Sequence, residues 1–328
     1  MNETNTENVE LNFFTQDGLV VTVYLSILCI VGIIGNGHAL LIYTVYYKPM
    51  NCRVFVQWLS SIDLSVCAIC IPFEICVIHQ YSMFSVDIIC KVFRFFTHAL
   101  VITSGVMLAV IAIHRKQKLG NPLGKQFSLK NAHIACFCVL MVTGIVSIPA
   151  VFFYQTETFR TKIPEVDVHQ CTLNNDVIQF PYFKIFIGFL TFLTNIVYII
   201  CLIAYSFILK VIIGQLKRTS YVISGKTDTP FDSLNHSKQI TMLFIATTTL
   251  SYVGYMSYII SIWITIINPD TNTCALCTIF FRGFFLSSAA NPVVYLFLDR
   301  KFRQECRQLY LKLLGVCRFR FKSHEINS

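Results

Sequence analysis

The chain has 328 residues, of which 55% are hydrophobic and only 13% are charged, and its formal net charge is +9 at pH 7. A typical soluble domain carries about 25% charged residues, because water must solvate its surface. This composition argues against a soluble globular protein and favours a chain that crosses a membrane several times.

Seven stretches are long and apolar enough to cross a bilayer, which takes about 20 residues per helix. In chain order they cover residues 19–46, 54–79, 88–114, 132–154, 177–213, 240–267 and 276–298. The sequence therefore predicts an extracellular N-terminal segment over 1–18, a seven-span domain over 19–298, and a cytoplasmic tail over 299–328.

The basic residues predict how the chain is oriented. If the N-terminus lies outside the cell, most of the 26 Lys and Arg fall in cytoplasmic loops and in the tail, as the positive-inside rule requires. The opposite orientation would place the same residues outside. The positive net charge is thus a sign of membrane topology, and no nucleic-acid partner is expected.

Four of the 14 cysteines fall on the side predicted to be extracellular. An even number of cysteines in an oxidising compartment suggests two disulfides. A bridge between Cys90 and Cys171 would tie the start of the third span to the second outer loop. Cys274 and Cys277 form a C-x-x-C pair, for which a small loop staple is favoured over a zinc or redox role.

Several short motifs resemble those of the rhodopsin-like (class A) G-protein-coupled receptors, and their order and spacing match that family together. Cys90 also lies 25 residues before Arg115, the family's separation between its loop cysteine and its conserved arginine. The motifs are Gly35-Asn36, Leu59-Ser60-Ser61-Ile62-Asp63-Leu64 and Asn291-Pro292-Val293-Val294-Tyr295. The resemblance runs from about Gly35 to Phe302. It implies an all-α, seven-transmembrane helix bundle with a short amphipathic eighth helix on the cytoplasmic side.

The chain departs from the family at its switching motifs. The arginine motif reads His114-Arg115-Lys116 and lacks both the acid and the tyrosine. The fourth span has no tryptophan and the fifth has no proline. The sixth reads Ser251-Tyr252-Val253-Gly254-Tyr255, where the family usually has Cys-Trp-x-Pro-Tyr. The sequence therefore indicates a divergent member.

Asp63 lies near the middle of the second span, where an uncompensated charge is costly. The resemblance implies that Asp63 binds a sodium ion, together with oxygen atoms of Ser104, Ser287, Ser288 and Asn291. The alternative is a protonated Asp63 that is hydrogen-bonded to Asn291 without an ion. No other cofactor is expected.

The resemblance also implies a switch near the cytoplasmic side. Its members would be His114, Arg115, Tyr205, Tyr252, Pro292 and Tyr295. Pro292 removes one backbone hydrogen bond and lets its helix bend, and Tyr205 and Tyr295 could then swing towards Arg115. The alternative is a belt of interfacial tyrosines. Because no acid stands beside Arg115 or at the foot of the sixth span, we expect signalling without ligand.

A second group of polar residues lies one to three turns below the outer surface. Ionisable residues at this depth face a cavity or pair with each other. They form either a ligand pocket or a structural Glu74–Arg282 salt bridge, and the sequence does not favour one over the other. Amine receptors of this family carry an aspartate in the third span where this chain has Thr97, and opsins carry a retinal-linking lysine in the seventh span where this chain has Phe285. These differences argue against an amine ligand and against retinal. A peptide ligand suits the pocket, and a small acid or lipid suits it almost as well. The pocket residues are Glu74, Arg94, Thr97, His98, Tyr255, Tyr258 and Arg282.

After residue 298 the pattern changes to apolar residues alternating with cations, which predicts an amphipathic helix that lies on the inner leaflet of the membrane. Cys317 is the first candidate for palmitoylation and Cys306 is the second. The alternative is that these thiols are unmodified. Asn2 begins an Asn-Glu-Thr glycosylation pattern.

We therefore expect a multi-pass plasma-membrane receptor that passes ligand binding to a heterotrimeric G protein. It is not expected to be an enzyme, because no span carries a recognisable catalytic constellation. The rivals are a seven-span protein that binds ligand without driving G proteins and, less favoured, a transporter, which would need charges along a continuous path.

Overall fold

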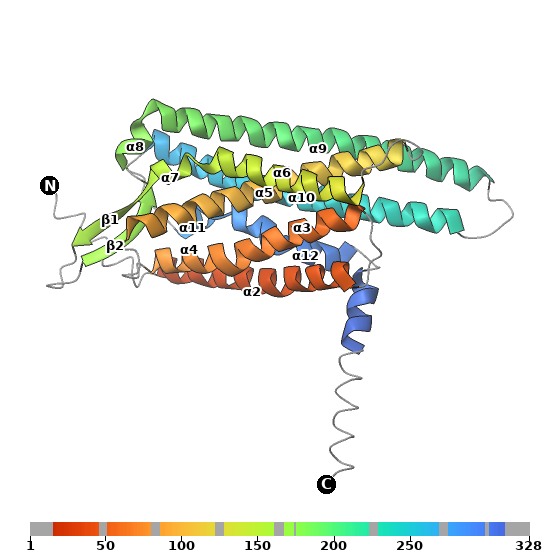
Figure 1. Cartoon of the computed structure of the whole chain (residues 1–328), viewed down its shortest axis with the longest axis horizontal. Coiled ribbons are helices and arrows are strands. Elements are labelled where there is room, and N and C mark those ends of the chain that lie inside the picture. The colour runs from red at the N-terminus through yellow and green to blue at the C-terminus, as the bar shows by residue number, and fades with distance from the viewer. Residues whose placement is uncertain are drawn as a thin grey trace, which may run out of the picture.

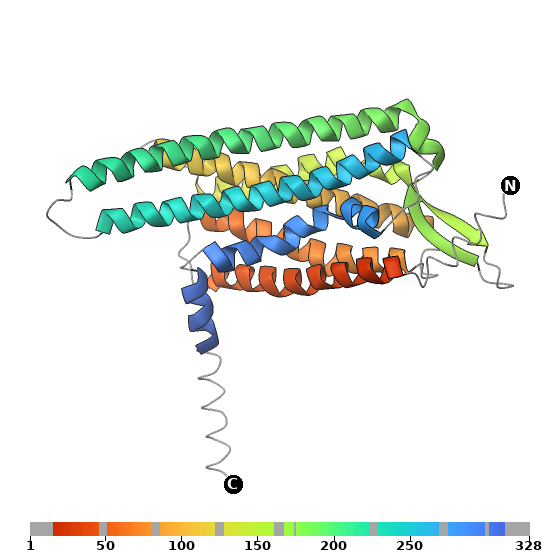
Figure 2. The ribbon, with the colours of Figure 1, turned by 180° about the vertical axis from the view of Figure 1, so that it is seen from behind.

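A computed structural model describes residues 16–45, 51–79, 86–121, 128–160, 167–173, 175–222, 229–268, 275–298 and 302–311. These residues form an elongated bundle of helices with a small hairpin at one end (Figures 1 and 2). We refer to that end of the bundle as the hairpin end and to the opposite end, where the helix over 302–311 lies, as the tail end.

The helices follow the predicted spans, and the all-α seven-helix fold is confirmed. Six of the described segments are long and apolar enough to cross a bilayer, and the seventh span is divided into two helices. The helical elements are α2 (Gln16–Val45), α3 (Asn51–Ser65), the π-helical η1 (Val66–Cys70), α4 (Ile71–Ile78), α5 (Asp87–Gly120), α6 (Leu129–Ser147), α7 (Ala150–Phe153), α8 (Asn175–Gln179), α9 (Pro181–Val222), α10 (Thr229–Ile267), α11 (Ala275–Phe281) and α12 (Phe284–Leu298).

Three helices extend beyond the apolar stretches that predicted them. Helix α5 continues through the basic segment after Arg115 to Gly120. Helices α9 and α10 contain 42 and 39 residues and project past their neighbours at the tail end (Figure 1). Hydropathy marks only the part of a helix that lies in lipid, so it underestimates helices that continue into water.

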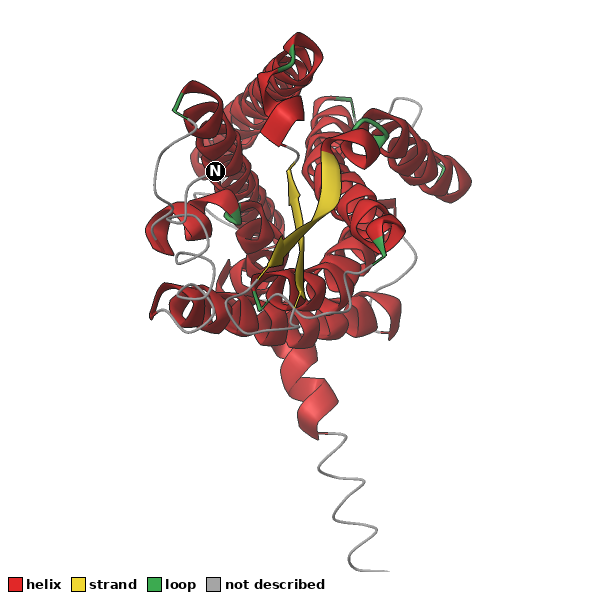
Figure 3. Cartoon of the chain, turned by 90° about the vertical axis from the view of Figure 1, so that its left-hand side faces the viewer, coloured by secondary structure: helices red, strands yellow, loops and turns green. Residues whose placement is uncertain are grey.

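The loop after the fourth span forms a β-hairpin that the sequence analysis did not predict. Strands β1 (Tyr154–Arg160) and β2 (Asp167–Leu173) pair in antiparallel register, with Thr156 opposite Cys171. Seen from the hairpin end, the two strands lie across the middle of the ring of helices (Figure 3).

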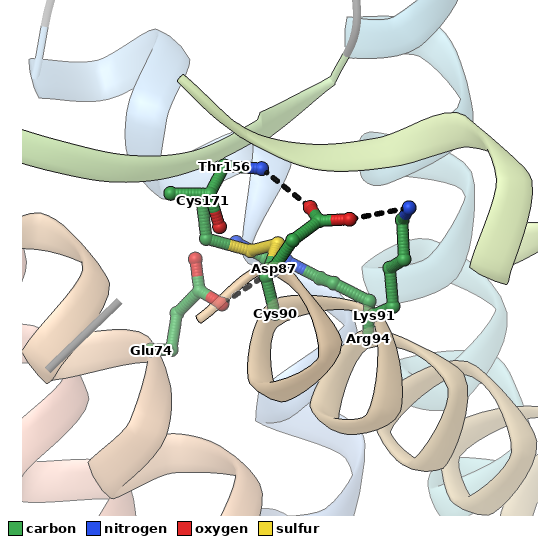
Figure 4. The surroundings of a disulfide bond; sticks show 7 residues. All are labelled: Glu74, Asp87, Cys90, Lys91, Arg94, Thr156 and Cys171. Carbon is green, nitrogen blue, oxygen red and sulfur yellow. Dashed lines mark hydrogen bonds and ion pairs between the residues drawn. A yellow bond between two sulfur atoms is a disulfide. The ribbon is translucent and has the colours of Figure 1, made fainter. Parts of the chain in front are cut away.

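A disulfide joins this hairpin to the bundle, as predicted. Cys90, in the first turn of α5, is bonded to Cys171 of β2, and their Cα atoms are 5.5 Å apart (Figure 4). Asp87 adds a second connection, because its Oδ1 accepts a hydrogen bond from the backbone N–H of Thr156 at 2.9 Å. The hairpin is thus held over the bundle by α5. The predicted Cys274–Cys277 staple involves Cys274, which lies outside the described residues.

Two apolar clusters fill the bundle, one in each half. The cluster in the hairpin half includes Leu25 and Phe285, and the cluster in the tail half includes Leu59 and Tyr295. Buried polar side chains lie at the level between them: Asn36, Asp63, Ser104, Ser288 and Asn291.

The helix over 302–311 leaves the bundle at a steep angle (Figure 1), as expected for a helix that lies on a membrane surface. Phe302 is 3% exposed and packs against Tyr43 and Tyr295. Arg303 donates to the carbonyl oxygens of Leu296 and Phe297, which lie near the end of α12. The predicted eighth helix is therefore present. Cys306 lies on it, half-buried, whereas Asn2 and Cys317 lie outside the described residues.

We expect Cys90→Ser to lower the melting temperature of the purified receptor and its level at the cell surface. The bridge closes a loop of 81 residues, so its loss costs about 4.5 kcal/mol of stability in the chain-entropy model. Cys138→Ser, which removes an exposed free thiol in α6, is the matched control. Equal melting and surface levels for both variants would contradict a structural role for the bridge.

Candidate functional site

A buried carboxylate lies at the centre of the polar residues at the hairpin end. Glu74 is only 1% exposed. Its Oε2 accepts a hydrogen bond from Arg94 Nη1 at 2.6 Å, and its Oε1 lies 2.8 Å from Arg282 Nη2. Figure 4 shows the Glu74–Arg94 pair beside the disulfide. The predicted Glu74–Arg282 salt bridge is therefore present, and Arg94 belongs to it as well.

Local irregularities of the second span accompany the placement of Glu74 inside the bundle. The π-helical segment Val66–Cys70 inserts a wider turn just before Pro72, at the start of α4. Proline lacks the N–H that an α-helix would use at this point, and a π-bulge changes which face the following residues present. Glu74 comes two residues after Pro72 and is buried.

Arg282 reaches the same carboxylate because the seventh span is interrupted. Arg282 and Gly283 form the turn between α11 and α12. This turn packs tightly against α10: a Cβ atom on Gly254 would lie 2.6 Å from the carbonyl oxygen of Gly283. Ser257 Oγ also donates to the carbonyl oxygen of Phe280 at 3.0 Å. Two glycines thus allow the backbones to approach.

The cluster carries more positive than negative charge. Arg94 and Arg282 share one carboxylate, and the Nε–H group of each is buried without a hydrogen-bond partner among the described residues. The guanidinium of Arg94 also lies 4.9 Å from the ring centroid of Tyr154, within range of a cation–π contact. Buried charges are usually paired and hydrogen-bonded, so this cluster can accept a further anionic group.

The other predicted pocket residues surround this cluster. The ring of His98 lies 5.8 Å from that of Tyr154 and 5.9 Å from that of Tyr258. Tyr255 contacts Tyr258, and Thr97, one turn after Arg94, is buried. Tyr154 was missed, because its position at the end of an apolar stretch marked it only as a boundary.

Asp63 lies at the middle of the bundle in a second polar cluster. Its Oδ1 accepts a hydrogen bond from Ser104 Oγ at 2.7 Å, and its Oδ2 accepts one from Asn291 Nδ2 at 2.7 Å. Asn36 Nδ2 donates to the backbone oxygen of Ser288 at 2.9 Å. The hydroxyl of Ser287 instead donates to the backbone of its own helix. Ser104 and Asn291 thus lie against Asp63, whereas sodium binding by this cluster stays a prediction.

At the tail end, Arg115 is bonded to α10. Its Nη2 donates to Thr241 Oγ1 at 2.9 Å and to the Ser237 carbonyl oxygen at 3.2 Å, and its guanidinium lies 5.3 Å from the ring of Phe244. His114 faces another helix and packs against Phe55 of α3. The sequence offers no acid at the foot of the sixth span, and the structure places the neutral side chain of Thr241 against Arg115 instead.

The remaining predicted switch residues contact several helices. Tyr205 Oη lies 3.3 Å from Thr248 Oγ1 of α10. Tyr252 stacks on Tyr198 and donates to Asn195 Oδ1 at 2.9 Å, so its hydroxyl is turned towards α9. Tyr295 is 1% exposed and lies against aromatic rings of α2 and the tail helix.

Pro292 packs directly against α2. A Cβ atom on Gly35 would lie 2.5 Å from Pro292 Cγ, so only a glycine fits there. This contact gives the Gly35-Asn36 pair of the first span a physical explanation, since the glycine admits the proline and the asparagine bonds to α12.

The arrangement of helices, disulfide and polar clusters can be compared with known proteins. The sequence profile described as "7 transmembrane receptor (rhodopsin family)" matches residues 35–295. The chain belongs to this family. Galanin receptor 2b of Danio rerio is 22% identical over 98% of this chain and 82% of its own length. Neuropeptide Y receptor type 6 of Mus musculus is 22% identical over 89% of this chain and 80% of its own length. Neuropeptide Y receptor type 4 of Mus musculus is 27% identical over 40% of this chain and 35% of its own length.

Membership in the rhodopsin family establishes the general class of this protein. It is a multi-pass receptor of the G-protein-coupled class at the plasma membrane, and the members of this family are receptors and not enzymes. For a receptor, the cluster around Glu74 is the candidate ligand site, and the Arg115–Thr241 contact is the candidate switch at the other end.

Proposed function

We propose that this receptor binds a peptide at the hairpin end and passes the signal to a heterotrimeric G protein at the tail end. In this proposal the N-terminus and the hairpin lie outside the cell. The basic loops and the tail helix face the cytoplasm, in agreement with the distribution of Lys and Arg.

The observation that carries the proposal is the excess positive charge around Glu74. Two buried guanidinium groups share one carboxylate, and each keeps an N–H group that lacks a partner among the described residues. A carboxylate of the ligand would satisfy both N–H groups and neutralise the excess charge, as paired arginines commonly do for carboxylates. The internal salt bridge then holds the pocket together until the ligand arrives.

Two further features favour a peptide over a small acid. The hairpin lies across the opening of the bundle and exposes strand edges to which a peptide backbone can hydrogen-bond (Figure 3). The similar receptors are named for galanin and neuropeptide Y. A small carboxylic acid remains the second candidate, because Arg94 and Arg282 would recognise it equally well.

Helix α10 connects the ligand site with the switch. It carries Tyr255 and Tyr258 near the hairpin end and Thr241 at the tail end. A ligand that shifts α10 would break the neutral hydrogen bond to Arg115 and release the arginine towards a G protein. The alternative function is that the receptor binds its ligand without activating G proteins. The altered arginine motif favours this alternative.

A sodium ion at Asp63 fits the same scheme. The carboxylate of Asp63, the hydroxyl of Ser104 and the amide of Asn291 lie together, and hard cations such as sodium prefer oxygen ligands of this kind. Ser288, which is buried nearby, would complete the set, whereas the hydroxyl of Ser287 would have to rotate away from its own backbone. A bound ion would neutralise Asp63 and tie α3, α5 and α12 together.

The ligand proposal predicts that methyl esterification of carboxylates will inactivate the active fraction of a tissue extract. Activity is measured as ligand-stimulated guanine-nucleotide exchange in membranes that contain the receptor. Arg282→Gln should reduce potency by about 10- to 100-fold, because it leaves a buried ligand charge unpaired. Lys91→Gln, which breaks an exposed pair with Asp87, should leave potency unchanged.

Protease treatment of the same extract separates the two ligand classes. Loss of activity supports a peptide, whereas activity that survives protease but not esterification supports a small acid. Esterified extract that remains fully active would contradict the carboxylate proposal.

The sodium proposal predicts that the ligand-free receptor melts at a higher temperature in sodium chloride than in choline chloride of equal ionic strength. Stabilisation is about 1.4 kcal/mol when sodium is present at ten times its dissociation constant. Asp63→Asn should abolish the difference while preserving the size of the side chain. Identical melting of the parent protein in both salts would show that no sodium ion is bound.

Thr241→Val should raise ligand-free nucleotide exchange, because valine matches the shape of threonine but cannot accept the hydrogen bond from Arg115. Removing about 1.4 kcal/mol of bias towards the resting state raises a small active population about tenfold. Thr247→Val is the control, since among the described residues the hydroxyl of Thr247 bonds to the carbonyl oxygen of Phe244 in its own helix. Exchange that does not change in Thr241→Val would exclude this contact as a restraint.

A further inference from the structure

An exposed serine stands just before helix α6, which begins at the tail end of the bundle (Figure 1). The side-chain oxygen of Ser128 accepts a hydrogen bond from the backbone N–H of Asn131 at 3.1 Å. The backbone of Ser128 is extended, with φ −77° and ψ 160°. The two residues that follow, Leu129 and Lys130, are exposed as well. The hydroxyl group is therefore open to solution, on a segment of chain that has not yet turned into a helix.

The sequence around Ser128 is basic. From Arg115 to His133 the chain contains five Lys and Arg and no Asp or Glu. Two of these cations, Lys125 and Lys130, stand three positions before the serine and two positions after it. Ser128 is also the only Ser, Thr or Tyr in this stretch. The positive-inside rule explains why lysines gather here, and the serine between two of them is a separate feature.

Capping of α6 explains only part of this arrangement. Asn and Asp accept the same hydrogen bond from the first turn of a helix as readily as serine does. Serine differs from both because its hydroxyl group can be converted into a phosphate ester. Kinases select their substrates partly by charge pattern, and a kinase with an acidic substrate groove favours a serine that has lysines on both sides.

We propose that Ser128 is a phosphorylation site for a serine/threonine kinase that prefers basic flanking residues. ATP supplies the phosphoryl group. A bond forms between Ser128 Oγ and the γ-phosphorus, and the bond from that phosphorus to the bridging oxygen of ADP breaks. ADP leaves, and the hydroxyl proton passes to a base of the kinase. The proposal rests on the orientation given in the proposed function, because it requires the tail end to face the ATP of the cytosol.

The start of α6 is a favourable place for a phosphate. The first turn of a helix carries a partial positive charge and N–H groups, such as that of Asn131, that can donate to phosphate oxygens. A phosphoserine has a charge of about −1.5 to −2 at pH 7, which offsets the two flanking lysines. Phosphorylation thus stabilises the start of α6 and removes positive charge from the face that the proposed function assigns to the G protein.

Treatment of the full-length receptor in lipid nanodiscs with ATP and the catalytic domain of protein kinase C tests the site. Both faces of a nanodisc are open to the kinase, so the result does not depend on receptor orientation, ligand or G protein. We expect mass spectrometry to find a phosphate on Ser128. Lys130→Gln should slow its incorporation about fivefold, the loss expected for one exposed charge contact.

Lys91→Gln is the matched control, because it removes an exposed lysine at the other end of the bundle and should leave the rate unchanged. Absence of phosphate from Ser128 in the parent, or equal rates in the two lysine variants, would overturn the proposal.

Ser128→Asn separates the modification from the capping bond. Asparagine caps α6 but cannot be phosphorylated, so this variant should melt at the temperature of the unmodified parent and carry no phosphate at this position. Ser128→Thr should restore phosphorylation. Hydrogen exchange at the Asn131 amide should become slower when the parent is phosphorylated and should not change in Ser128→Asn treated with kinase. Faster exchange in the phosphorylated parent would contradict a phosphate held by the first turn.

The side of the membrane is tested separately in cells that express the receptor. Kinase and ATP should phosphorylate Ser128 in permeabilised cells and not when they are added to intact cells. Phosphorylation of Ser128 in intact cells would place α6 in the opposite orientation and would exclude a cytosolic kinase, even if the nanodisc experiment identifies Ser128 as an acceptor.

Discussion

A charged carboxylate enclosed in a membrane-spanning bundle is costly unless cations or hydrogen-bond donors compensate it, and the architecture of the hairpin end depends on how two arginines compensate Glu74. The two guanidinium groups come from α5 and from the turn between α11 and α12. Both guanidinium groups must reach the carboxylate of Glu74. The π-helical turn before α4, the interrupted seventh span and the contact between Gly254 and Gly283 can all be understood as backbone adjustments that allow this meeting. The disulfide at Cys90 then holds the hairpin one turn above Arg94.

Deeper in the bundle, uncharged groups form hydrogen bonds with two charged side chains. Asp63 is bonded by a hydroxyl and an amide, and Arg115 by a hydroxyl and a backbone carbonyl. A hydrogen bond of this kind stabilises a charged side chain without itself introducing a second charge. It costs less to break than a buried ion pair, whose separation leaves two unpaired charges. The Glu74 cluster, with its two buried ion pairs, is therefore held more tightly than the hydrogen bonds at Asp63.

The features that the sequence predicted are those that local chemistry determines or that the resemblance to a known family implies. Apolar runs located the seven spans, the change of period after residue 298 located the tail helix, and the resemblance brought Asp63 together with Ser104 and Asn291. The features that were missed depend on contacts between distant segments. Nothing near Thr241 in the sequence indicates that Arg115 lies beside it, because a threonine carries no charge that would mark it as the partner of an arginine. The turn at Arg282 is equally hidden, because its cause is the approach of Gly254 from another helix.

The length of α10 has a mechanical consequence. From Gly254, where the helix is pressed against the seventh span, to its first residue, Thr229, there are 25 residues, or about 38 Å of helix at 1.5 Å per residue. The arm on the other side of Gly254, which ends at Ile267, is about 20 Å long by the same rise. If the helix pivots at the glycine contact, a tilt of about 10° moves the long arm by roughly 6–7 Å, more than one helical pitch of about 5.4 Å. The short arm moves only about half as far. A displacement of the size of one side chain near the hairpin would then open a gap at the tail end wide enough to admit part of another protein.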